Sequence, residues 1–575
     1  MPYAATGGKE YMENGKISEA NKYDAQAGRE VYAAVNKEFE SGYELNKELL
    51  MKILKDNSAT EYGIKYGFAD IKTVEDYQKK VPVITYEDIA DDIERMSNGE
   101  KDILTAYPFK HMNETSATTG SPKRIPMTDE QSKVFLKYNK RYLDGLKAEL
   151  LDNGWMEGRA FATTEGKHRT LPSGITVGDA SSVMADYIRG GKETLGSMME
   201  TIFTSPVEAT FPVPNTDTKY IHTRFALMDE NITGMISAFY SIVTNYLKYI
   251  ADNYEMLIDD IEQGTINKDV KISEEVRKSL LEKIKPMPER AAKLREIFKN
   301  GSDFCFVPHV WPKMIYIIGI GGDGFSIYDN IIKEHYTGDC LKNIYSGVTA
   351  SEGLWSVPIG LDIEDSVMAP CSAFFEFLPV ECGDDLSKCI TMDKLEVGKI
   401  YEIIATNLCG FYRYRTRDAV LITGYKGTTP TVKFMYRTNR TINMAAEKTT
   451  EKALQVAVEG AMNELGLELA DFNVYPDYAD MKYVFLIEPM VDNTGVGEEK
   501  LTKCIYKHMR EANHEFANYV DTGRLKNPVA HWLQPQTNSL YRDIRIFKGA
   551  SANQIKPVRI IMNEEQKNFF FNLIK

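Results

Sequence analysis

The pattern of apolar positions predicts both long helices and buried strands. Apolar residues recur at helical spacing over residues 25–54 and again over 234–250, so we expect an amphipathic helix in each segment. Residues 314–320 are a continuous apolar run of the length of a buried strand. Residues 401–422 alternate like successive strands, with Gly410 at the turn. The pattern therefore indicates a mixed α/β chain.

The pattern changes at residues 424–431, a segment of Gly, Tyr, Lys, Thr and Pro with the composition of a linker. Beyond it, residues 432–437 are predicted to form a strand and residues 447–465 a helix with apolar residues on one face. We therefore expect a domain boundary in this segment.

The length of the chain bounds the number of domains, and its net charge narrows the classes of partner. A chain of 575 residues corresponds to about three or four domains, or to one large domain with a smaller one. The net charge is −14, which argues against nucleic acid or an anionic membrane as the main partner, because both favour a basic face. A local cluster of basic side chains could still bind ATP.

The lack of a recognisable targeting signal and the pattern of cysteines predict a cytoplasmic protein. No run of about 18 apolar residues is present, and residues 1–22 are polar. The chain has seven cysteines, an odd number, and no C-x-x-C motif. We expect reduced cysteines in a cytoplasmic protein, and no zinc site, since H-E-x-x-H and Cys/His clusters are also missing.

The segment from Thr115 to Lys123 carries the most distinctive chemistry. Hydroxyl groups, a glycine amide and a lysine are the groups that cradle a polyphosphate. The candidate phosphate-binding residues are Ser116, Thr118, Thr119, Gly120 and Lys123. A Ser/Thr-rich surface turn would explain the same residues.

A second glycine-rich segment follows the apolar run at 314–320. Gly319–Gly324 fits G-x-G-x-x-G, and residues 325–335 are predicted to form a helix. This arrangement is typical of a dinucleotide-binding fold, so an NAD-binding oxidoreductase is one hypothesis. A glycine turn after a buried strand is the other.

Several motifs together resemble one enzyme family. S-x-T-T-G-x-P-K at residues 116–123 is similar to the phosphate loop of the adenylate-forming superfamily, which includes luciferases and acyl-CoA synthetases. Residues 122–130 narrow the resemblance to the Gretchen Hagen family of auxin-responsive acyl-acid amido synthetases. Further matching motifs lie at 345–355, 410–418, 434–439 and 548–557. Ala117, Val348 and Arg417 stand where the family usually has Gly, Tyr and Gly.

The resemblance implies an adenylate-forming enzyme fold of mixed α/β type. It implies a large N-terminal domain, residues 1–428, with β-sheets and a β-barrel-like part flanked by helices. A small α+β C-terminal domain, residues 429–575, would rotate between two half-reactions about a hinge within residues 420–433.

The resemblance also implies an activity and roles for single residues. A carboxylic acid would be activated by ATP with Mg²⁺ as an acyl-adenylate, and an amine, such as an amino acid, would then form an amide. Lys556 would be the mobile catalytic lysine, and Glu352 would be catalytic and bind Mg²⁺. Nucleotide binding would involve the loop residues above and Ser351, Glu352, Gly353, Asp418 and Arg437. Substrate binding would involve Thr176, Val177, Gly178, Val348 and Thr349.

Other readings stay open at this point. An acyl-CoA synthetase would share the first half-reaction and then use a thiol. A member that binds nucleotide without turnover is a non-enzymatic reading. The sequence does not identify the acid or the amine, and we expect a monomer.

Overall fold

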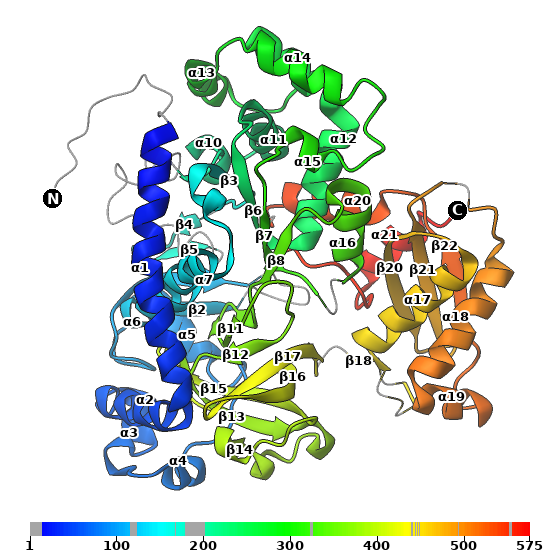
Figure 1. Cartoon of the computed structure of the whole chain (residues 1–575). Helices are drawn as coiled ribbons and strands as arrows, with labels where there is room; N and C mark the ends of the chain where they lie inside the picture. Colours follow the sequence, from blue (N-terminus) through cyan, green and yellow to red (C-terminus); the bar gives the residue numbers. More distant parts are fainter. Residues whose placement is uncertain are drawn as a thin grey trace.

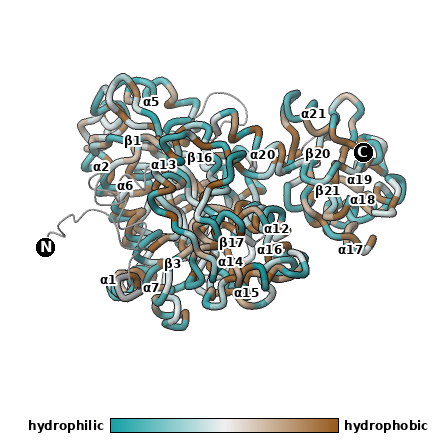
Figure 2. Tube along the Cα trace, turned by 90° about the horizontal axis from the view of Figure 1, so that it is seen from above, coloured by the Kyte–Doolittle hydropathy of each residue, from teal (hydrophilic) through white to brown (hydrophobic). Residues whose placement is uncertain are grey.

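The structure, a computed structural model, describes residues 14–115, 123–166, 168–178, 202–322, 326–438, 441–442, 444–445, 447, 449–492, 494–550 and 555–575. Its elements form two groups that lie side by side (Figures 1 and 2). The larger group contains the elements up to β17 (Thr429–Arg437), together with α20 (Thr537–Phe547) on its border. The smaller group contains the elements around the C-terminal sheet.

The largest sheet has seven strands, all paired antiparallel, in the order β11-β12-β17-β16-β15-β13-β14. Its strands are β11 (Ser356–Pro358), β12 (Ser366–Met368), β13 (Ala373–Pro379), β14 (Ile390–Thr391), β15 (Ile400–Asn407), β16 (Tyr414–Lys426) and β17. The predicted strands over residues 401–422 are β15 and β16, with Gly410 in their connection at φ 93°. The predicted strand at 432–437 is part of β17.

A parallel sheet of four strands forms the second layer, in the order β3-β6-β7-β8. Its strands are β3 (Arg159–Ala162), β6 (Ile232–Phe239), β7 (Tyr316–Ile320) and β8 (Lys342–Tyr345). The predicted strand at 314–320 is β7. The glycine-rich segment follows it and leads into α16 (Ser326–Ile331) and the π-helical turn η5 (Ile332–Thr337).

The helix predicted over residues 234–250 is partly wrong. Residues 232–239 are strand β6, and α12 (Tyr240–Gln263) begins only at Tyr240. Strand β6 lies between β3 and β7 and is mostly buried, so its apolar residues form a nearly continuous run rather than an alternation. Such a run satisfies a helical period as well, which explains the error.

A mixed sheet of four strands completes the larger group. Its order is β2-β1-β5-β4, with β1 and β5 parallel and the other pairs antiparallel. The strands are β1 (Phe109–Glu114), β2 (Arg124–Thr128), β4 (His168–Thr170) and β5 (Thr176–Gly178). Strands β1 and β2 lie on either side of the predicted phosphate loop in the sequence. In this sheet β1 pairs with both β2 and β5.

The N-terminal helical segment consists of two helices rather than one. Helix α1 (Asn14–Glu40) runs along the larger group and contacts α7 (Tyr142–Leu150), and α2 (Gly42–Asp56) contacts β13. The break lies at Ser41, and a Cβ atom at Gly42 would lie 1.9 Å from the Thr429 hydroxyl. The chain therefore turns where α2 approaches β17 closely.

The smaller group is built on a three-stranded sheet in the order β20-β21-β22. Its strands are β20 (Leu469–Asp477), β21 (Lys482–Pro489) and β22 (Val529–Trp532). Helices α17 (Glu451–Leu465), α18 (Glu498–Ala512), α19 (His514–Asp521) and α21 (Glu564–Phe571) belong to the same group. Thr450 caps α17, because its hydroxyl accepts a hydrogen bond from the Ala453 amide, and most of the helix predicted at 447–465 is present.

The predicted boundary at residues 428 and 429 falls in the turn between β16 and β17. Strand β17 pairs with β16 and β12, so the chain leaves the seven-stranded sheet after Arg437. The division into two domains and the position of a hinge stay predictions.

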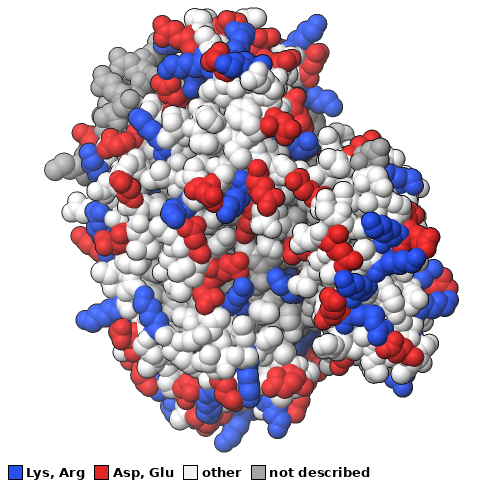
Figure 3. All heavy atoms as spheres, turned by 45° about the vertical axis from the view of Figure 1, so that its right-hand side comes forward, with Lys and Arg blue, Asp and Glu red and all other residues white. Residues whose placement is uncertain are grey.

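Two further observations concern the surface and the thiols. In the described part of the chain, every helix is too short or too polar to cross a bilayer. Figure 3 shows acidic and basic side chains interspersed over one face of both groups. All seven cysteines lie among the described residues, and each is a free thiol.

Candidate active site

The predicted phosphate loop connects β1 to β2. Its ends are joined by hydrogen bonds from the Thr115 amide to the Lys123 carbonyl, at 2.9 Å, and from the Lys123 amide to the Thr115 hydroxyl, at 3.3 Å. The Lys123 ammonium group lies 3.5 Å from the Glu87 carboxylate and 4.9 Å from the centre of the Tyr86 ring. The remaining predicted residues, Ser116, Thr118, Thr119 and Gly120, and also Ala117, lie outside the described residues.

Ser351 and Glu352 form the two-residue turn of the hairpin of β9 (Thr349–Ala350) and β10 (Gly353–Leu354). Two buried asparagines hold this turn by its carbonyl groups. The Asn113 amide of β1 donates to the Ser351 carbonyl and the Asn407 amide of β15 donates to the Glu352 carbonyl, each at 2.8 Å. The turn is thereby fixed between two different sheets.

The glycine after this turn has a steric cause. A Cβ atom at Gly353 would lie 2.6 Å from the ring of Trp355, which is itself fully buried. Any larger residue would displace the hairpin or the ring. The Ser351-Glu352-Gly353 sequence is therefore a structural unit as well as a candidate binding motif.

The Glu352 carboxylate accepts a hydrogen bond from the Tyr414 hydroxyl at 3.2 Å. Burial raises the pKa of Tyr414 far above its ordinary value, and the negative charge of Glu352 raises it further. Tyr414 is therefore protonated at any physiological pH and is a fixed donor to Glu352.

Asp418 and Arg437 face each other across β16 and β17. They are register partners, and Arg437 Nε lies 2.9 Å from Asp418 Oδ1. The Asp418 side chain is 4 % exposed, whereas that of Arg437 is 32 % exposed. The negative charge of Asp418 raises the pKa of Arg437, and Glu352 contributes in the same direction. The two carboxylates and the guanidinium therefore belong to one electrostatic cluster.

Arg417 has φ 65°, in the left-handed region that glycine adopts at least cost. It lies where the pairing of β15 and β16 is irregular, between Glu402 and Ile404. The position needs this backbone to place Asp418, and the Thr416 hydroxyl accepts the Asp418 amide at 3.1 Å. Arginine thus adopts a left-handed backbone here at a cost in strain.

The predicted substrate-binding residues lie in two places. Thr176, Val177 and Gly178 form β5, and Gly178 is the parallel partner of Asn113, so this strand lies beside the Ser351 turn. Val348 is buried in a hydrophobic cluster with Trp355 and Met368, and Thr349 begins β9. Their roles in substrate binding stay predictions.

The carboxyl ends of the parallel strands form a second part of the site. Phe239 at the end of β6 pairs with Ile320 at the end of β7, and Gly319 pairs with Tyr345 at the end of β8. Ligands of parallel sheets bind at this edge. The Lys556 ammonium group lies 5.6 Å from the centre of the Phe239 ring, although Lys556 is more than 300 positions later in the sequence.

Asp329 of α16 occupies the glycine turn at this edge. Its Oδ2 accepts the Gly322 amide at 2.8 Å and the Tyr345 hydroxyl at 3.2 Å. Burial raises the pKa of Asp329 to about 7. A carboxylate bound to the amide that a dinucleotide phosphate would use disfavours the NAD hypothesis for Gly319–Gly324.

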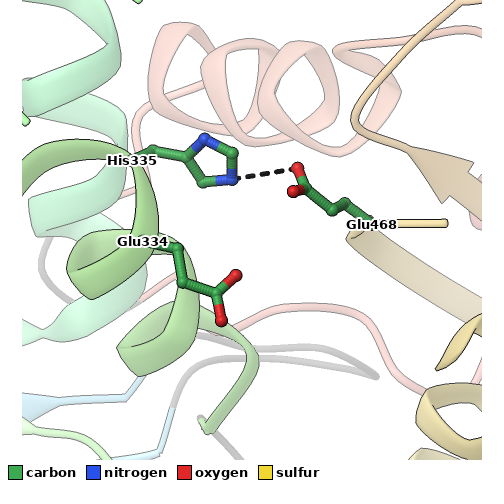
Figure 4. Close-up of side chains that lie close together, drawn as sticks. All are labelled: Glu334, His335 and Glu468. Atoms are coloured by element: carbon green, nitrogen blue, oxygen red, sulfur yellow. Dashed lines mark ion pairs between the residues drawn. The ribbon is translucent and has the colours of Figure 1, made fainter. Parts of the chain in front are cut away.

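Glu352 is the predicted metal ligand of the site, and a second cluster of potential ligands belongs to none of the predicted motifs. Glu352 offers a carboxylate oxygen on the turn that Asn113 of β1 holds, and a carboxylate is a ligand type that Mg²⁺ prefers. Among the described residues, the one group of three potential ligands within reach of one another is Glu334, His335 and Glu468 (Figure 4). His335 Nε2 already pairs with Glu468 at 3.1 Å, and Glu334 and Glu468 are exposed.

Two solved structures of acyl acid amido synthetases share this fold. The solved structure of a GH3.15 acyl acid amido synthetase superposes with a TM-score of 0.82, at 22% sequence identity, over 95% of this chain and 96% of that one. A second structure, of AtGH3.15 in complex with 2,4-DB, has a TM-score of 0.80 at 21% identity, over 99% of this chain and 98% of that chain.

Three family models match the chain in order. The GH3 family N-terminal domain matches residues 33–342, the GH3 family central domain residues 366–437, and the GH3 family C-terminal domain residues 452–565. The chain therefore belongs to the GH3 family. An indole-3-acetic acid-amido synthetase, GH3.3 of Arabidopsis thaliana, is 28% identical over 90% of this chain and 89% of its own length. A 4-substituted benzoates-glutamate ligase, GH3.12 of the same plant, is 27% identical over 80% of both chains. The resemblance seen in the sequence motifs is thereby confirmed.

Sequence reasoning missed the residues that hold the site together. Asn113 and Asn407 carry no motif signal, and Tyr414 lies within the motif at 410–418 but was not singled out. The only signal in the sequence is that each asparagine lies close to a motif. It becomes informative once the structure places the two sheets and shows that both asparagines are buried.

Proposed function

We propose that this chain is an ATP-dependent acyl-acid amido synthetase. It activates a carboxylic acid as an acyl-adenylate with release of pyrophosphate, and it then transfers the acyl group to an amine, giving an amide and AMP. The observation that carries this proposal is the match to all three GH3 family domains, in order, from residue 33 to residue 565. The names of the relatives, amino-acid synthetases and ligases, support an amino acid as the amine.

The proposed nucleotide site is consistent with the chemistry of its side chains. Asp418 is an acceptor suited to the two ribose hydroxyls, and Arg437 holds one of its oxygens. The loop residues Ser116, Thr118, Thr119, Gly120 and Lys123 bind the β- and γ-phosphates. Ser351 and Gly353 shape the turn that carries Glu352.

Glu352 binds Mg²⁺ in this proposal. Tyr414 donates to Glu352 Oε1 and sets the direction of the carboxylate. The metal ion, when bound, neutralises phosphate charge. Glu352, oriented by Tyr414, would offer it a carboxylate oxygen.

Lys556 supplies positive charge to the α-phosphate and to the carboxylate oxygens as charge develops there. Its location over Phe239, at the carboxyl edge of the parallel sheet, supports this role. Thr176, Val177 and Gly178 of β5 border the acid and the amine in this proposal. Val348 and Thr349, at the start of the β9–β10 hairpin, also contribute to substrate binding. We propose further that the protein is a cytoplasmic monomer and that its C-terminal part rotates between the half-reactions.

The experiment is pyrophosphate release with ATP and Mg²⁺ over a panel of aryl and alkyl carboxylic acids with pooled amino acids. Release should depend on an acid and fall on the order of a hundredfold to a thousandfold in Lys556→Ala. Mass spectrometry of the same reactions should find the amide. A thioester formed only when CoA is added would indicate an acyl-CoA synthetase. No release with any acid, and binding of NAD, would contradict the proposal.

A further inference from the structure

The segment that carries Lys556 is anchored to β20 by buried polar groups. The Val474 amide donates to the Arg559 carbonyl and the Ile561 amide to the Val474 carbonyl, each at 2.8 Å. The Asn473 amide group donates to the Val558 carbonyl at 2.6 Å. Lys556 lies three positions before Arg559 in this anchored segment.

The Arg559 guanidinium is the buried centre of this anchor. It forms an ion pair with Asp471, donates to the Phe472 carbonyl at 3.1 Å, and lies 4.5 Å from the centre of the Phe472 ring. The Arg559 and Asp471 side chains are 6 % and 9 % exposed. All these partners come from β20, within the smaller group of elements.

One side chain of the larger group completes the cluster. The Tyr328 hydroxyl of α16 donates to Asp471 Oδ2 at 2.7 Å, and Arg559 Nη2 lies 3.5 Å from the same hydroxyl. Tyr328 is 6 % exposed. A hydrogen bond to a charged, buried carboxylate is among the strong ones, because no water competes for it.

Tyr328 also lies next to the glycine turn of the parallel sheet. Its neighbour Asp329 accepts the Gly322 amide and the Tyr345 hydroxyl at the carboxyl edge. Tyr328 and Lys556 line the same cavity, which has a volume of about 180 Å³. Two consecutive residues of α16 thus contact the carboxyl edge of the parallel sheet on one side and the anchor of the Lys556 segment on the other.

We propose that Tyr328 is a positioning residue for Lys556. By donating to Asp471 and accepting from Arg559, Tyr328 holds the 555–561 segment so that Lys556 lies over Phe239 at the edge of the parallel sheet. This inference rests on the proposed function, since it assigns Lys556 to the adenylation step. The bond is needed while Lys556 acts and is not needed for attack of the amine.

The segments that directly follow α16 and directly precede β20 share a more exposed contact that serves as a control. His335 of η5 pairs with Glu468, which precedes β20, and these side chains are 25 % and 58 % exposed (Figure 4). Exposed pairs of this kind contribute little to the contact. Glu468→Gln therefore tests whether the loss of any contact between α16–η5 and the start of β20 slows adenylation as Tyr328→Phe is expected to do.

The experiment separates the two half-reactions in Tyr328→Phe. The variant keeps the ring and the Asp471–Arg559 pair, so its melting temperature should stay close to that of the wild type. Exchange of labelled pyrophosphate into ATP, with the best acid of the panel, should fall about tenfold. Attack of an amino acid on supplied acyl-adenylate should stay within twofold, and Glu468→Gln should leave both rates within twofold.

Hydrogen exchange of the free protein gives a second readout. Tyr328→Phe should increase deuterium uptake in residues 555–558 and leave β20 unchanged. Equal falls in both half-reactions, or an unchanged exchange rate with unchanged uptake, would overturn the positioning role. If the wild type itself shows no acid-dependent exchange, the proposed function fails, and the deuterium uptake still decides whether Tyr328 holds the segment.

Discussion

The side chain of Asn113 donates a hydrogen bond of 2.8 Å to the backbone carbonyl of Ser351, across a separation of 238 positions in the sequence. It ties the strand before the predicted phosphate loop to the turn that carries Glu352. The two motifs thus share a fixed relative position through a residue that belongs to neither.

Asn113→Ala should therefore lower activity more than stability. Asn113 is 1 % exposed, and its Oδ1 has no hydrogen-bond partner in the described part of the chain, so removal of that buried oxygen offsets part of the lost bond. We expect a stability loss of about 1 kcal/mol and a fall in pyrophosphate release of about tenfold or more. Urea unfolding and initial rates measure the two effects.

Asn407→Ala is the matched comparison for Asn113→Ala. Asn407 donates to the Glu352 carbonyl, and its Oδ1 accepts the amides of Cys409 and Phe411 at 3.0 and 3.1 Å. Its loss leaves buried amides unpaired, so we expect a stability loss of about 2–4 kcal/mol. An Asn113→Ala enzyme with full activity would contradict the role given to the Ser351 contact.

Asp418→Asn should weaken ATP binding without unfolding the protein. Arg437 is 32 % exposed and can be solvated when its partner loses its charge, so the stability loss should stay below about 1 kcal/mol. In the proposed site the ribose hydroxyls of ATP donate hydrogen bonds to the charged Asp418 carboxylate. An uncharged amide accepts these bonds more weakly, so the KM for ATP should rise about tenfold to a hundredfold. An unchanged KM for ATP would remove Asp418 from the nucleotide site.

Glu376→Ala should be one of the most destabilising single changes. Glu376 and Arg413 form a bidentate ion pair at 2.8 and 2.9 Å, and their side chains are 1 % and 7 % exposed. Truncation leaves a buried guanidinium without its carboxylate, at a cost of about 3–5 kcal/mol.

The control for Glu376→Ala is Glu499→Ala, which removes an exposed i,i+4 pair with Lys503. We expect a change of at most about 0.5 kcal/mol. Urea unfolding of both variants at neutral pH measures the contrast, and similar losses in the two would contradict it.

Glu488→Gln should change how stability depends on pH. Glu488 of β21 is 5 % exposed, and burial raises its pKa to about 7. Because this carboxyl has a higher pKa in the folded state, the folded protein binds more protons than the unfolded chain between about pH 4 and pH 7. The free energy of unfolding is therefore highest below about pH 4 and falls as the pH rises to about 7. The loss should be about 3 kcal/mol.

Glutamine keeps the oxygen that accepts the Asn538 amide and side chain at 2.9 and 2.8 Å, and it cannot ionise. The variant should match the wild type near pH 4.5 and exceed it in stability near pH 8. Unfolding free energies at the two pH values test this, and a constant difference between the proteins would count against the assigned titration.

Much of the local structure was determined by the sequence alone. Strand β7, the β15–β16 connection at Gly410 and most of α17 follow from apolar periodicity and from turn and cap residues, because these signals act over a few neighbouring positions. The family followed from short motifs in a fixed order, and the family models and the related fold confirm it. Asp418, Glu352 and Lys556 were named from those motifs.

Only the tertiary structure decided how these residues are assembled. Residues 232–239 became strand β6 because β3 and β7 flank them, a relation that no local period contains. Asn113, Asn407 and Tyr328 became informative only when their partners, tens to hundreds of positions away, were placed. A buried hydrogen bond depends on which groups exclude water together, and that is a property of packed sheets and helices rather than of a sequence segment.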